Sequence, residues 1–331
     1  MSNIPSLLSM RNVRLEFSTE QGTVHALRGV DLDVGRDEVV GLVGESGCGK
    51  TVLGLSILGL NPIPPAKLLE GSQILFMGKD LAKLASKEFA LVRGTGVSMI
   101  FQEPATSLNP VFTIGDQITE SIRLRFQRGE NTPTPPSSVI NEKVYEALRL
   151  VKIADPERIA HRYPHELSGG MKQRAMIAMA LAAKPSMLIA DEPTTALDVT
   201  IQAQILRLMR DLMNEVKTSI LFITHDLGVI AEIADRVAVM YAGRIVEESN
   251  VKELFNEPLH PYTQGLLASL PRLSDLDKEI QQLPGSVPDA INPPQGCSFH
   301  PRCKFAMDQC RTMQPELKEV RPGHKVACHL Y

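Results

Sequence analysis

Short apolar runs in the first quarter of the chain have the spacing of β-strands. Residues 7–17 alternate between apolar and polar positions, and residues 29–34 form a second strand pattern. Residues 39–43 are continuously apolar and end at Gly44, as expected of a buried strand. A helix should follow over 50–60, and the prolines at positions 62, 64 and 65 should end it.

The pattern changes in the middle of the chain. Residues 111–185 look mostly helical, apart from a polar, proline-rich interruption at 131–138 that predicts a loop. Strand patterns then return as two buried runs and one hairpin, at 187–190, 220–224 and 236–247. Strands that alternate with helices predict a parallel α/β core, and the helical middle is expected to be an insertion into it.

The composition of the sequence changes again near residue 250. Prolines recur from there to the C-terminus, which predicts a small, loop-rich extension. We therefore expect one domain over 1–250, with a helical subdomain at about 103–185, and a second domain over 251–331. A core as small as that of the extension would gain stability from a metal.

Composition narrows the possible functions. The chain has 331 residues, and its formal net charge of −3 argues against a nucleic-acid binder that works through bulk electrostatics. No stretch approaches the roughly 18–20 unbroken apolar residues of a membrane span, and residues 1–10 lack the features of a signal peptide. We expect a cytoplasmic protein that serves a membrane, if at all, by docking onto other chains.

A glycine-rich segment follows the predicted buried strand and precedes the predicted helix. It fits the pattern G-x-x-x-x-G-K-[ST] and consists of Gly44, Glu45, Ser46, Gly47, Cys48, Gly49, Lys50 and Thr51. Its backbone N–H groups and the helix N-terminus can bind phosphate groups of ATP. Lys50 should reach the β- and γ-phosphates, and the Thr51 hydroxyl should bind Mg²⁺. Cys48 is expected to be only a small residue in this loop.

Acidic and histidine side chains lie at the ends of two later strands. The run 187–190 ends at Asp191 and Glu192, where the tips of parallel strands face a ligand crevice. Asp191 should hold Mg²⁺, and Glu192 should act as general base on the attacking water. His225 follows the run 220–224, where its imidazole could contact the γ-phosphate.

The segment Leu-Ser-Gly-Gly-Met-Lys-Gln-Arg at 167–174, with the motifs above, closely resembles the signature of ATP-binding-cassette (ABC) ATPases. The resemblance implies a P-loop ABC-type α/β fold with an antiparallel β subdomain. It also implies that two such domains enclose two ATP molecules, with Ser168, Gly169 and Gly170 of one capping the ATP of the other. Met171 departs from the usual Gln, so no phosphate contact is assigned to it.

Further matches to the same family extend the resemblance. Gln102 resembles the glutamine of the Q-loop, which implies that it senses Mg²⁺ and the attacking water. Residues 195–198 resemble the D-loop, which crosses the dimer interface. Phe17 matches the aromatic residue that stacks on adenine, and His25 is its rival for that role.

Three segments resemble the ATPases of peptide and nickel importers. They are the Q-loop at 101–110, the strand end and D-loop at 191–200, and a His-Pro-Tyr motif at 260–267. The resemblance implies a motor subunit of a peptide importer. Alternatives are an importer of another solute such as nickel, or a soluble ABC ATPase acting on nucleic acid or ribosomes.

The resemblance also implies partners. These are a second ABC ATPase subunit that is more often a paralogue than an identical chain, two membrane permease subunits and, indirectly, a solute-binding protein. No nucleic-acid partner is expected. The expected location is the cytoplasmic face of the inner membrane.

Four cysteines gather near the C-terminus: Cys297, Cys303, Cys310 and Cys328. In a reducing compartment such a cluster more often binds metal than forms disulfides. The spacing lacks the close cysteine pair of zinc sites, and four thiolates suit a [4Fe–4S] cluster. Peptide-importer ATPases with this C-terminal pattern are similar to proteins that hold such a cluster. This resemblance favours iron–sulfur over zinc, with free or disulfide-bonded thiols as the remaining alternative.

Overall fold

The computed structural model of the chain describes residues 6–130, 133–195, 198–270 and 283–331. These residues form two compact units. The first is built mainly from residues 84–222. The second combines residues 6–34 with 39–83 and 223–331, so its polypeptide is interrupted by the first.

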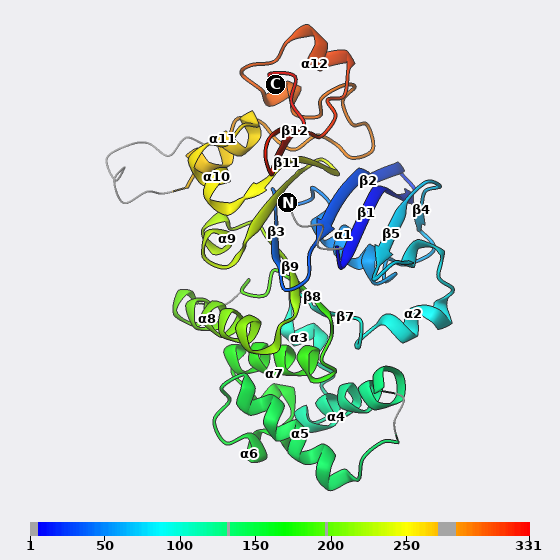
Figure 1. The fold of residues 1–331 in the computed structure, drawn as a ribbon, viewed down its shortest axis with the longest axis vertical. Helices are drawn as coiled ribbons and strands as arrows, with labels where there is room; N and C mark the ends of the chain where they lie inside the picture. Colours follow the sequence, from blue (N-terminus) through cyan, green and yellow to red (C-terminus); the bar gives the residue numbers. More distant parts are fainter. Residues whose placement is uncertain (1–5, 131–132, 196–197, 271–282) are drawn as a thin grey trace. The chain divides into compact units, whose positions relative to one another are not determined.

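An antiparallel sheet forms the N-terminal part of the second unit (Figure 1). Its strand order is β2-β1-β5-β6, and β4 also pairs with β1. The strands are β1 (Leu8–Thr19), β2 (Gly22–Val34), β4 (Ala66–Leu68), β5 (Gln73–Phe76) and β6 (Lys79–Asp80). The two predicted strands are confirmed, but β2 is longer than expected because register shifts along the β1–β2 pair interrupt the alternation of apolar and polar positions.

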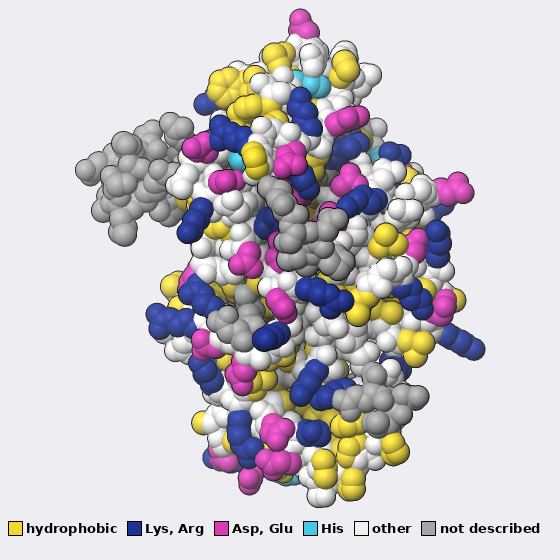
Figure 2. Space-filling model, viewed as in Figure 1, with side chains coloured by type: hydrophobic (Ala, Val, Ile, Leu, Met, Phe, Trp, Pro, Cys, Tyr) yellow, Lys and Arg dark blue, Asp and Glu magenta, His cyan; other side chains and the backbone are white. Residues whose placement is uncertain are grey.

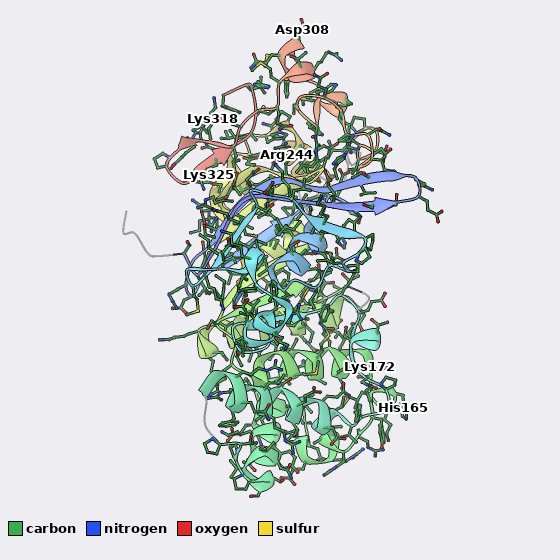
Figure 3. The ribbon with its side chains drawn as sticks, turned by 90° about the vertical axis from the view of Figure 1, so that its right-hand side faces the viewer. His165, Lys172, Arg244, Asp308, Lys318 and Lys325 are labelled. Carbon is green, nitrogen blue, oxygen red and sulfur yellow. The ribbon has the colours of Figure 1, made fainter. Side chains whose placement is uncertain are left out.

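The same unit contains the strand that leads into the glycine-rich loop. This strand, β3 (Val39–Val43), is fully buried and runs parallel to β10 (Arg236–Tyr241). From β10 the pairing continues antiparallel through β11 (Arg244–Asn250) to β13 (His324–Val326) and β12 (Lys318–Arg321). Figure 3 marks Lys318 and Lys325 on these last two strands. The predicted strand at 39–43 and the predicted hairpin are confirmed.

The first unit combines short buried strands with most of the helices. Strands β9 (Ser219–Thr224), β8 (Met187–Asp191) and β7 (Val97–Ile100) are neighbours, and β7 runs parallel to β8. Every residue of β8 and β9 is buried, which matches the continuous apolar runs in the sequence. The strand β7 was not among the predicted elements.

Helices occupy most of the segment that was predicted to be helical (Figure 1). They are α4 (Ile114–Leu124), the π-helical turn η2 (Arg125–Glu130), α5 (Ser137–Leu150), α6 (Pro156–Ala160), the 3₁₀ turn η3 (Pro164–Glu166) and α7 (Gly169–Ala182). Helices α2 (Ser86–Val92), α3 (Pro104–Ser107) and α8 (Val199–Val216) of the same unit lie outside the predicted range. The predicted loop at 131–138 is described only from residue 133 onward. Its last residues already belong to α5.

The C-terminal extension is made of short elements, as the prolines predicted. Its helices are α10 (Val251–Asn256), α11 (Pro261–Ala268), the 3₁₀ turn η5 (His300–Arg302) and α12 (Asp308–Thr312). Elsewhere, the second unit also contains α1 (Lys50–Ile57), the 3₁₀ turn η1 (Leu81–Lys83) and α9 (Leu227–Ile233). Helix α1 ends three residues before the expected end. The domain boundaries at residues 250, 103 and 185 remain predictions.

The surface carries charges of both signs. On the face in Figure 2, Lys and Arg side chains are interspersed with Asp and Glu rather than gathered in one basic field. Among the residues that the structure describes, none of the helices has the length and apolar character required to cross a bilayer.

Candidate functional site

The glycine-rich loop connects β3 to α1, the context that this motif requires. Gly49 is the N-cap of α1 and has a φ of 105°. A Cβ at this position would lie 2.7 Å from the carbonyl oxygen of Ala26, so the loop needs glycine both for its conformation and for space. The N–H groups of the first turn of α1 have no partner within the helix and can face a phosphate group.

Lys50 is buried and lies across this loop. Its ammonium donates hydrogen bonds to the carbonyl oxygens of Gly44, at 2.7 Å, and Glu45, at 3.1 Å. Burial raises the pKa of the neighbouring Cys48 thiol, although Lys50 acts in the opposite direction. The expectation that Cys48 is only a small residue of the loop remains a prediction.

A pocket of about 390 Å³ opens beside the loop in the second unit. Gly44, Glu45 and Ser46 line one part of it, together with His225. The structure thus brings His225 to the glycine-rich loop, although 174 positions or more separate them in the sequence. The remaining lining comes largely from the C-terminal extension, at Leu266, Ser269 and Leu283.

In the first unit, Gln102 and Glu192 meet directly. The side-chain amide of Gln102 donates a hydrogen bond of 3.0 Å to Glu192 Oε2, and the Thr195 hydroxyl donates one of 2.9 Å to the same oxygen. Both bonds hold the carboxylate in one orientation. A carboxylate fixed in this way, next to the end of a buried strand, can position a water molecule and accept its proton.

The backbone also places Glu192 in an unusual conformation. Its φ is 45°, in the left-handed region that non-glycine residues seldom adopt. It directly follows Asp191, the last residue of β8, whose side chain is almost fully buried. This turn separates the two carboxylates, so that the strand end offers one buried and one more accessible acidic group.

The signature segment forms the N-terminus of α7. Ser168 is its N-cap, and its hydroxyl accepts a hydrogen bond from the N–H of Met171 at 3.4 Å. Gly169 and Gly170 are the first two helical residues. A Cβ at Gly170 would lie 2.9 Å from Ile201 of α8, so this glycine permits the close packing of the two helices. The helix N-terminus can bind an anion.

The predicted adenine-stacking residues lie on the antiparallel sheet. Phe17 is half-buried on β1, where it pairs with Val24 of β2, and it does not line the pocket beside the glycine-rich loop. His25 bonds to the Glu16 carboxylate at 2.7 Å. Of the predicted D-loop at 195–198, residues 196 and 197 lie outside the described residues.

Two residues that were not among the predicted site residues reach the glycine-rich loop from the C-terminal extension. The Tyr262 hydroxyl accepts a hydrogen bond of 2.9 Å from the backbone N–H of Glu45. The Arg302 guanidinium donates to both carboxylate oxygens of Glu45, at 2.7 and 3.1 Å. The His-Pro-Tyr motif pointed to Tyr262 only as a family marker, and no local pattern marked Arg302.

The iron–sulfur prediction is wrong. Across the described ranges, no three or more His, Cys, Asp or Glu side chains form a group that could hold a metal ion. Cys297, Cys303, Cys310 and Cys328 are free cysteines. Partial burial raises the pKa of Cys297 to about 11, and it also raises the pKa values of Cys303 and Cys328.

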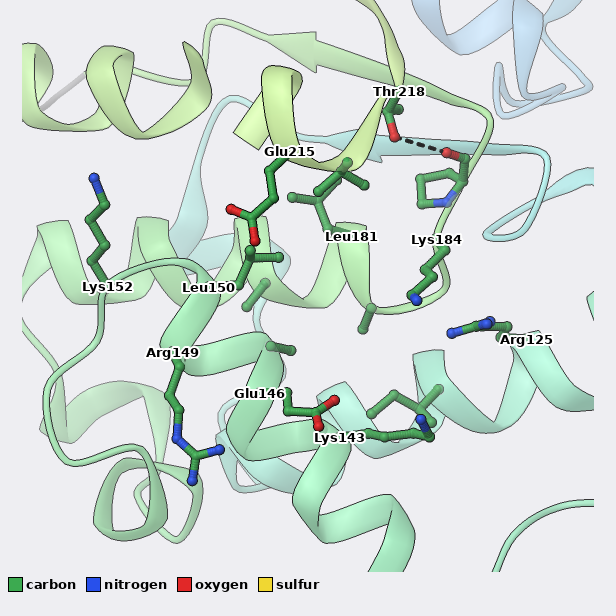
Figure 4. Close-up of a pocket in the computed structure, with 16 residues that line it drawn as sticks. Arg125, Lys143, Glu146, Arg149, Leu150, Lys152, Leu181, Lys184, Glu215 and Thr218 are labelled. Atoms are coloured by element: carbon green, nitrogen blue, oxygen red, sulfur yellow. Dashed lines mark hydrogen bonds between the residues drawn. The ribbon is translucent and has the colours of Figure 1, made fainter. Parts of the chain in front are cut away.

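A larger pocket, of about 780 Å³, lies among α5, α7 and α8 in the first unit (Figure 4). It contains none of the predicted site residues. Several of its cations lie near helix C-termini, such as Arg149 in α5 and Lys184 just after α7, where they complement the helix dipoles. The Thr218 hydroxyl donates to the carbonyl of Pro185 at 3.2 Å. We assign this pocket no catalytic role.

Two family models match the sequence. The model described as "ABC transporter" matches residues 27–195, which is more than half of the chain. The model described as "Oligopeptide/dipeptide transporter, C-terminal region" matches residues 246–310.

Individual proteins resemble the chain over nearly its whole length. A Sinorhizobium fredii protein named "Probable peptide ABC transporter ATP-binding protein" is 51% identical, covering 97% of this chain and 94% of its own. The oligopeptide transport ATP-binding protein AppD of Bacillus subtilis is 48% identical, covering 98% and 97%.

Solved structures resemble the fold of the chain. A dimeric ATP-binding cassette in a post-hydrolysis state with ADP and Pi matches with a TM-score of 0.65 and 24% identity, over 74% of this chain and 98% of its own. At that identity the likeness supports the fold alone. It agrees with the predicted P-loop ABC-type α/β class.

Proposed function

The chain belongs to the ABC transporter family, as an ATP-binding and ATP-hydrolysing subunit that powers a peptide importer, and on this premise we propose the role of each site residue. The relatives described above are named for peptides, which favours peptides over nickel as the transported solute. The subunit associates with membrane permease components, as transporters of this family require.

We propose that the glycine-rich loop binds the phosphates of ATP. Its backbone N–H groups and the N-terminus of α1 would face the phosphate oxygens, with contributions from Ser46, Gly47 and Gly49. Lys50 would exchange its bonds to the loop carbonyls for bonds to the β- and γ-phosphates. Its ammonium lies against the loop that would hold the phosphates, which supports this assignment.

Thr51, Asp191 and Gln102 would face the Mg²⁺ ion that accompanies ATP. All three offer oxygen atoms, the ligands that Mg²⁺ prefers, and Asp191 lies at the buried end of β8. The ion, when bound with ATP, would neutralise charge on the phosphates.

Our proposal that Glu192 is the general base rests on the hydrogen bond between Gln102 and Glu192. Glu192 would accept a proton from the water that attacks the γ-phosphate, while Gln102 and His225 would orient that water. The Gln102 amide orients the carboxylate and lies on the loop after β7, so it would also link the chemistry to the permease. Phe17, with His25 as the rival residue, would stack on the adenine ring.

We further propose that a second ABC ATPase subunit, a paralogue rather than an identical chain, completes each catalytic site. Ser168, Gly169 and Gly170 at the N-terminus of α7 would cap the γ-phosphate of the ATP held by that partner. Two permease subunits and, indirectly, a solute-binding protein would complete the transporter. The subunit would work at the cytoplasmic face of the inner membrane.

Replacing Glu192 by Gln tests the general-base assignment. The amide keeps the size of the side chain but cannot accept a proton, so we expect ATP to bind with nearly unchanged affinity. Hydrolysis should fall by about a hundredfold or more. Single-turnover hydrolysis and equilibrium ATP binding measure the two effects in the complex purified with its permease subunits.

The variant Glu232→Gln on α9 provides a matched control for the same chemical change at a different place. We expect near wild-type turnover from it. Near wild-type turnover in Glu192→Gln would refute the assignment of the base.

A further inference from the structure

The His-Pro-Tyr helix and the turn at 300–302 bring the C-terminal extension onto the glycine-rich loop. Both contacts are made to Glu45, the second residue of the loop. The Tyr262 hydroxyl accepts a hydrogen bond from the backbone N–H of Glu45, and the Arg302 guanidinium binds the Glu45 carboxylate. The loop residue is therefore held at its main chain and at its side chain by two separate elements.

Arg302 is itself fixed on every side. Its side chain is only 4% exposed, and its Nε donates to the carbonyl oxygen of Pro284 at 2.8 Å. The guanidinium lies over the rings of Tyr241 and Phe299, with its carbon 5.8 and 6.0 Å from their centroids. A bidentate bond from so constrained a group fixes the direction of the Glu45 carboxylate.

Tyr262 is equally constrained. It is fully buried, and its ring centroid lies 4.6 Å from that of Tyr241 and 5.5 Å from that of Phe299. His260 caps the helix that carries it by accepting the N–H of Tyr262 at 3.0 Å. The hydroxyl that holds Glu45 thus belongs to a rigid aromatic cluster, formed by Tyr241, His260, Tyr262 and Phe299.

The charge of Glu45 makes this arrangement consequential for ATP. A carboxylate in a phosphate-binding loop would repel the phosphates unless a cation neutralises it and holds it aside. The carbonyl of the same residue also accepts a hydrogen bond from Lys50. Holding Glu45 therefore affects both the local charge and the position of the lysine that reaches the phosphates.

We propose that Arg302 and Tyr262 are positioning residues for ATP binding, through which the C-terminal extension sets the conformation and charge of the phosphate-binding loop. The inference rests on the proposed nucleotide site. It gives the extension a direct role in ATP affinity, beyond any contact with transporter partners.

The substitution Arg302→Met tests the charge contact, because methionine retains much of the side-chain volume between the two rings. We expect the Kd of a non-hydrolysable ATP analogue to rise about tenfold, and the KM for ATP to rise with it. The kcat of the assembled transporter should stay within about twofold, because the reacting groups are untouched. The control Arg321→Met removes an exposed ion pair with Glu257 on the same extension and should leave both constants unchanged.

A second substitution separates positioning from a general loss of structure. In the Arg302→Met background, Glu45→Ala removes the unneutralised carboxylate and should recover much of the lost affinity. A folded Arg302→Met variant with wild-type affinity would overturn the proposal, and so would a loss that Glu45→Ala does not relieve. Arg302→Lys should restore affinity only in part, because one ammonium cannot reproduce the bidentate bond.

Two further variants complete the test. If Arg302→Met fails to fold, Tyr262→Phe decides, because it removes only one hydroxyl. A rise in Kd of about threefold or more supports the proposal, and an unchanged Kd overturns it. Lys50→Ala distinguishes the premise from the inference: ATP binding that survives this change shows that the nucleotide site itself was misassigned.

Discussion

Among single residues, His260 illustrates how burial controls protonation. It is completely buried, and the loss of hydration lowers its pKa from 6.5 to about 3. The imidazole is therefore neutral at physiological pH, and its Nδ1 is available to accept the N–H of Tyr262. The fold depends on the neutral form of this side chain.

This dependence predicts a loss of stability in mild acid. Since the folded pKa lies below the unfolded value of about 6.5, the unfolded chain binds more protons, and the stabilisation is complete only above that value. It should be lost as the pH falls from about 6.5 toward 3, by about 2 kcal/mol at pH 5. Chemical denaturation at pH 7 and pH 5 measures the difference.

His260→Asn serves as the control for this prediction. Asparagine can still cap α11 but does not titrate, so the variant should lose less free energy of unfolding between pH 7 and pH 5 than the wild-type chain does. Equal losses in the two proteins would show that other groups cause the acid sensitivity.

Among the elements, β11 connects the ATPase core to the extension through one buried carboxylate. Glu247 of β11 accepts hydrogen bonds from the backbone N–H groups of Leu259 and His260, at 2.7 and 2.9 Å. It also accepts one from His324 of β13 at 2.8 Å. This single side chain therefore joins a strand, the start of α11 and the strand β13.

Replacing Glu247 by Gln should detach these elements from one another. The amide would place a donor against donors in a fully buried site, and we expect a loss of about 3 kcal/mol in the free energy of unfolding. Amide hydrogen exchange should accelerate at Leu259 and His260. The exposed pair of Arg321 with Glu257 provides the comparison, since Arg321→Ala should change stability by less than about 1 kcal/mol. Unchanged protection at the two amides would contradict this role of Glu247.

The predictability of the elements followed their length and pattern. The buried strands β3, β8 and β9 were predictable because their apolar runs are continuous. Short strands such as β6 and β13 were not, because two or three residues carry no periodicity. In the site, the motifs identified the phosphate loop and the acidic strand end, whereas the contact of Arg302 with Glu45 spans 257 residues and has no local signal.

The cysteine prediction failed for a related reason. Spacing along the chain indicates which residues could gather, but it says nothing of how their thiols are oriented or whether they ionise. In the fold, Cys297 and Cys310 are linked through their backbones, by an N–H to carbonyl bond of 2.8 Å. Among the described residues, no three His, Cys, Asp or Glu side chains come together in a group that could hold a metal ion.

For the whole molecule, function is expected to require a second ATPase subunit. If the α7 N-terminus caps ATP held by that partner, Ser168→Arg should block closure of the pair by placing a bulky cation in the interface. ATP affinity of the isolated chain should be unchanged, while ATPase activity of the assembled transporter should fall about a hundredfold. Light scattering of the ATPase subunits without the permease, carrying Glu192→Gln and supplied with ATP, measures how far the two subunits associate.

The control for the interface is Ser137→Arg, which places the same side chain at the start of another helix, α5. It should leave association and turnover unchanged. Normal ATP-driven association of the Ser168→Arg variant would exclude the proposed contact with the partner's nucleotide.

The bond between Glu45 and Arg302 also has a consequence for biosynthesis. The phosphate loop is translated early, while Arg302, which fixes the Glu45 carboxylate, is translated 257 residues later. A nascent chain that has not yet reached Arg302 therefore has a loop without this restraint. Tight ATP binding should arise only after the extension has been synthesised and has folded onto the loop.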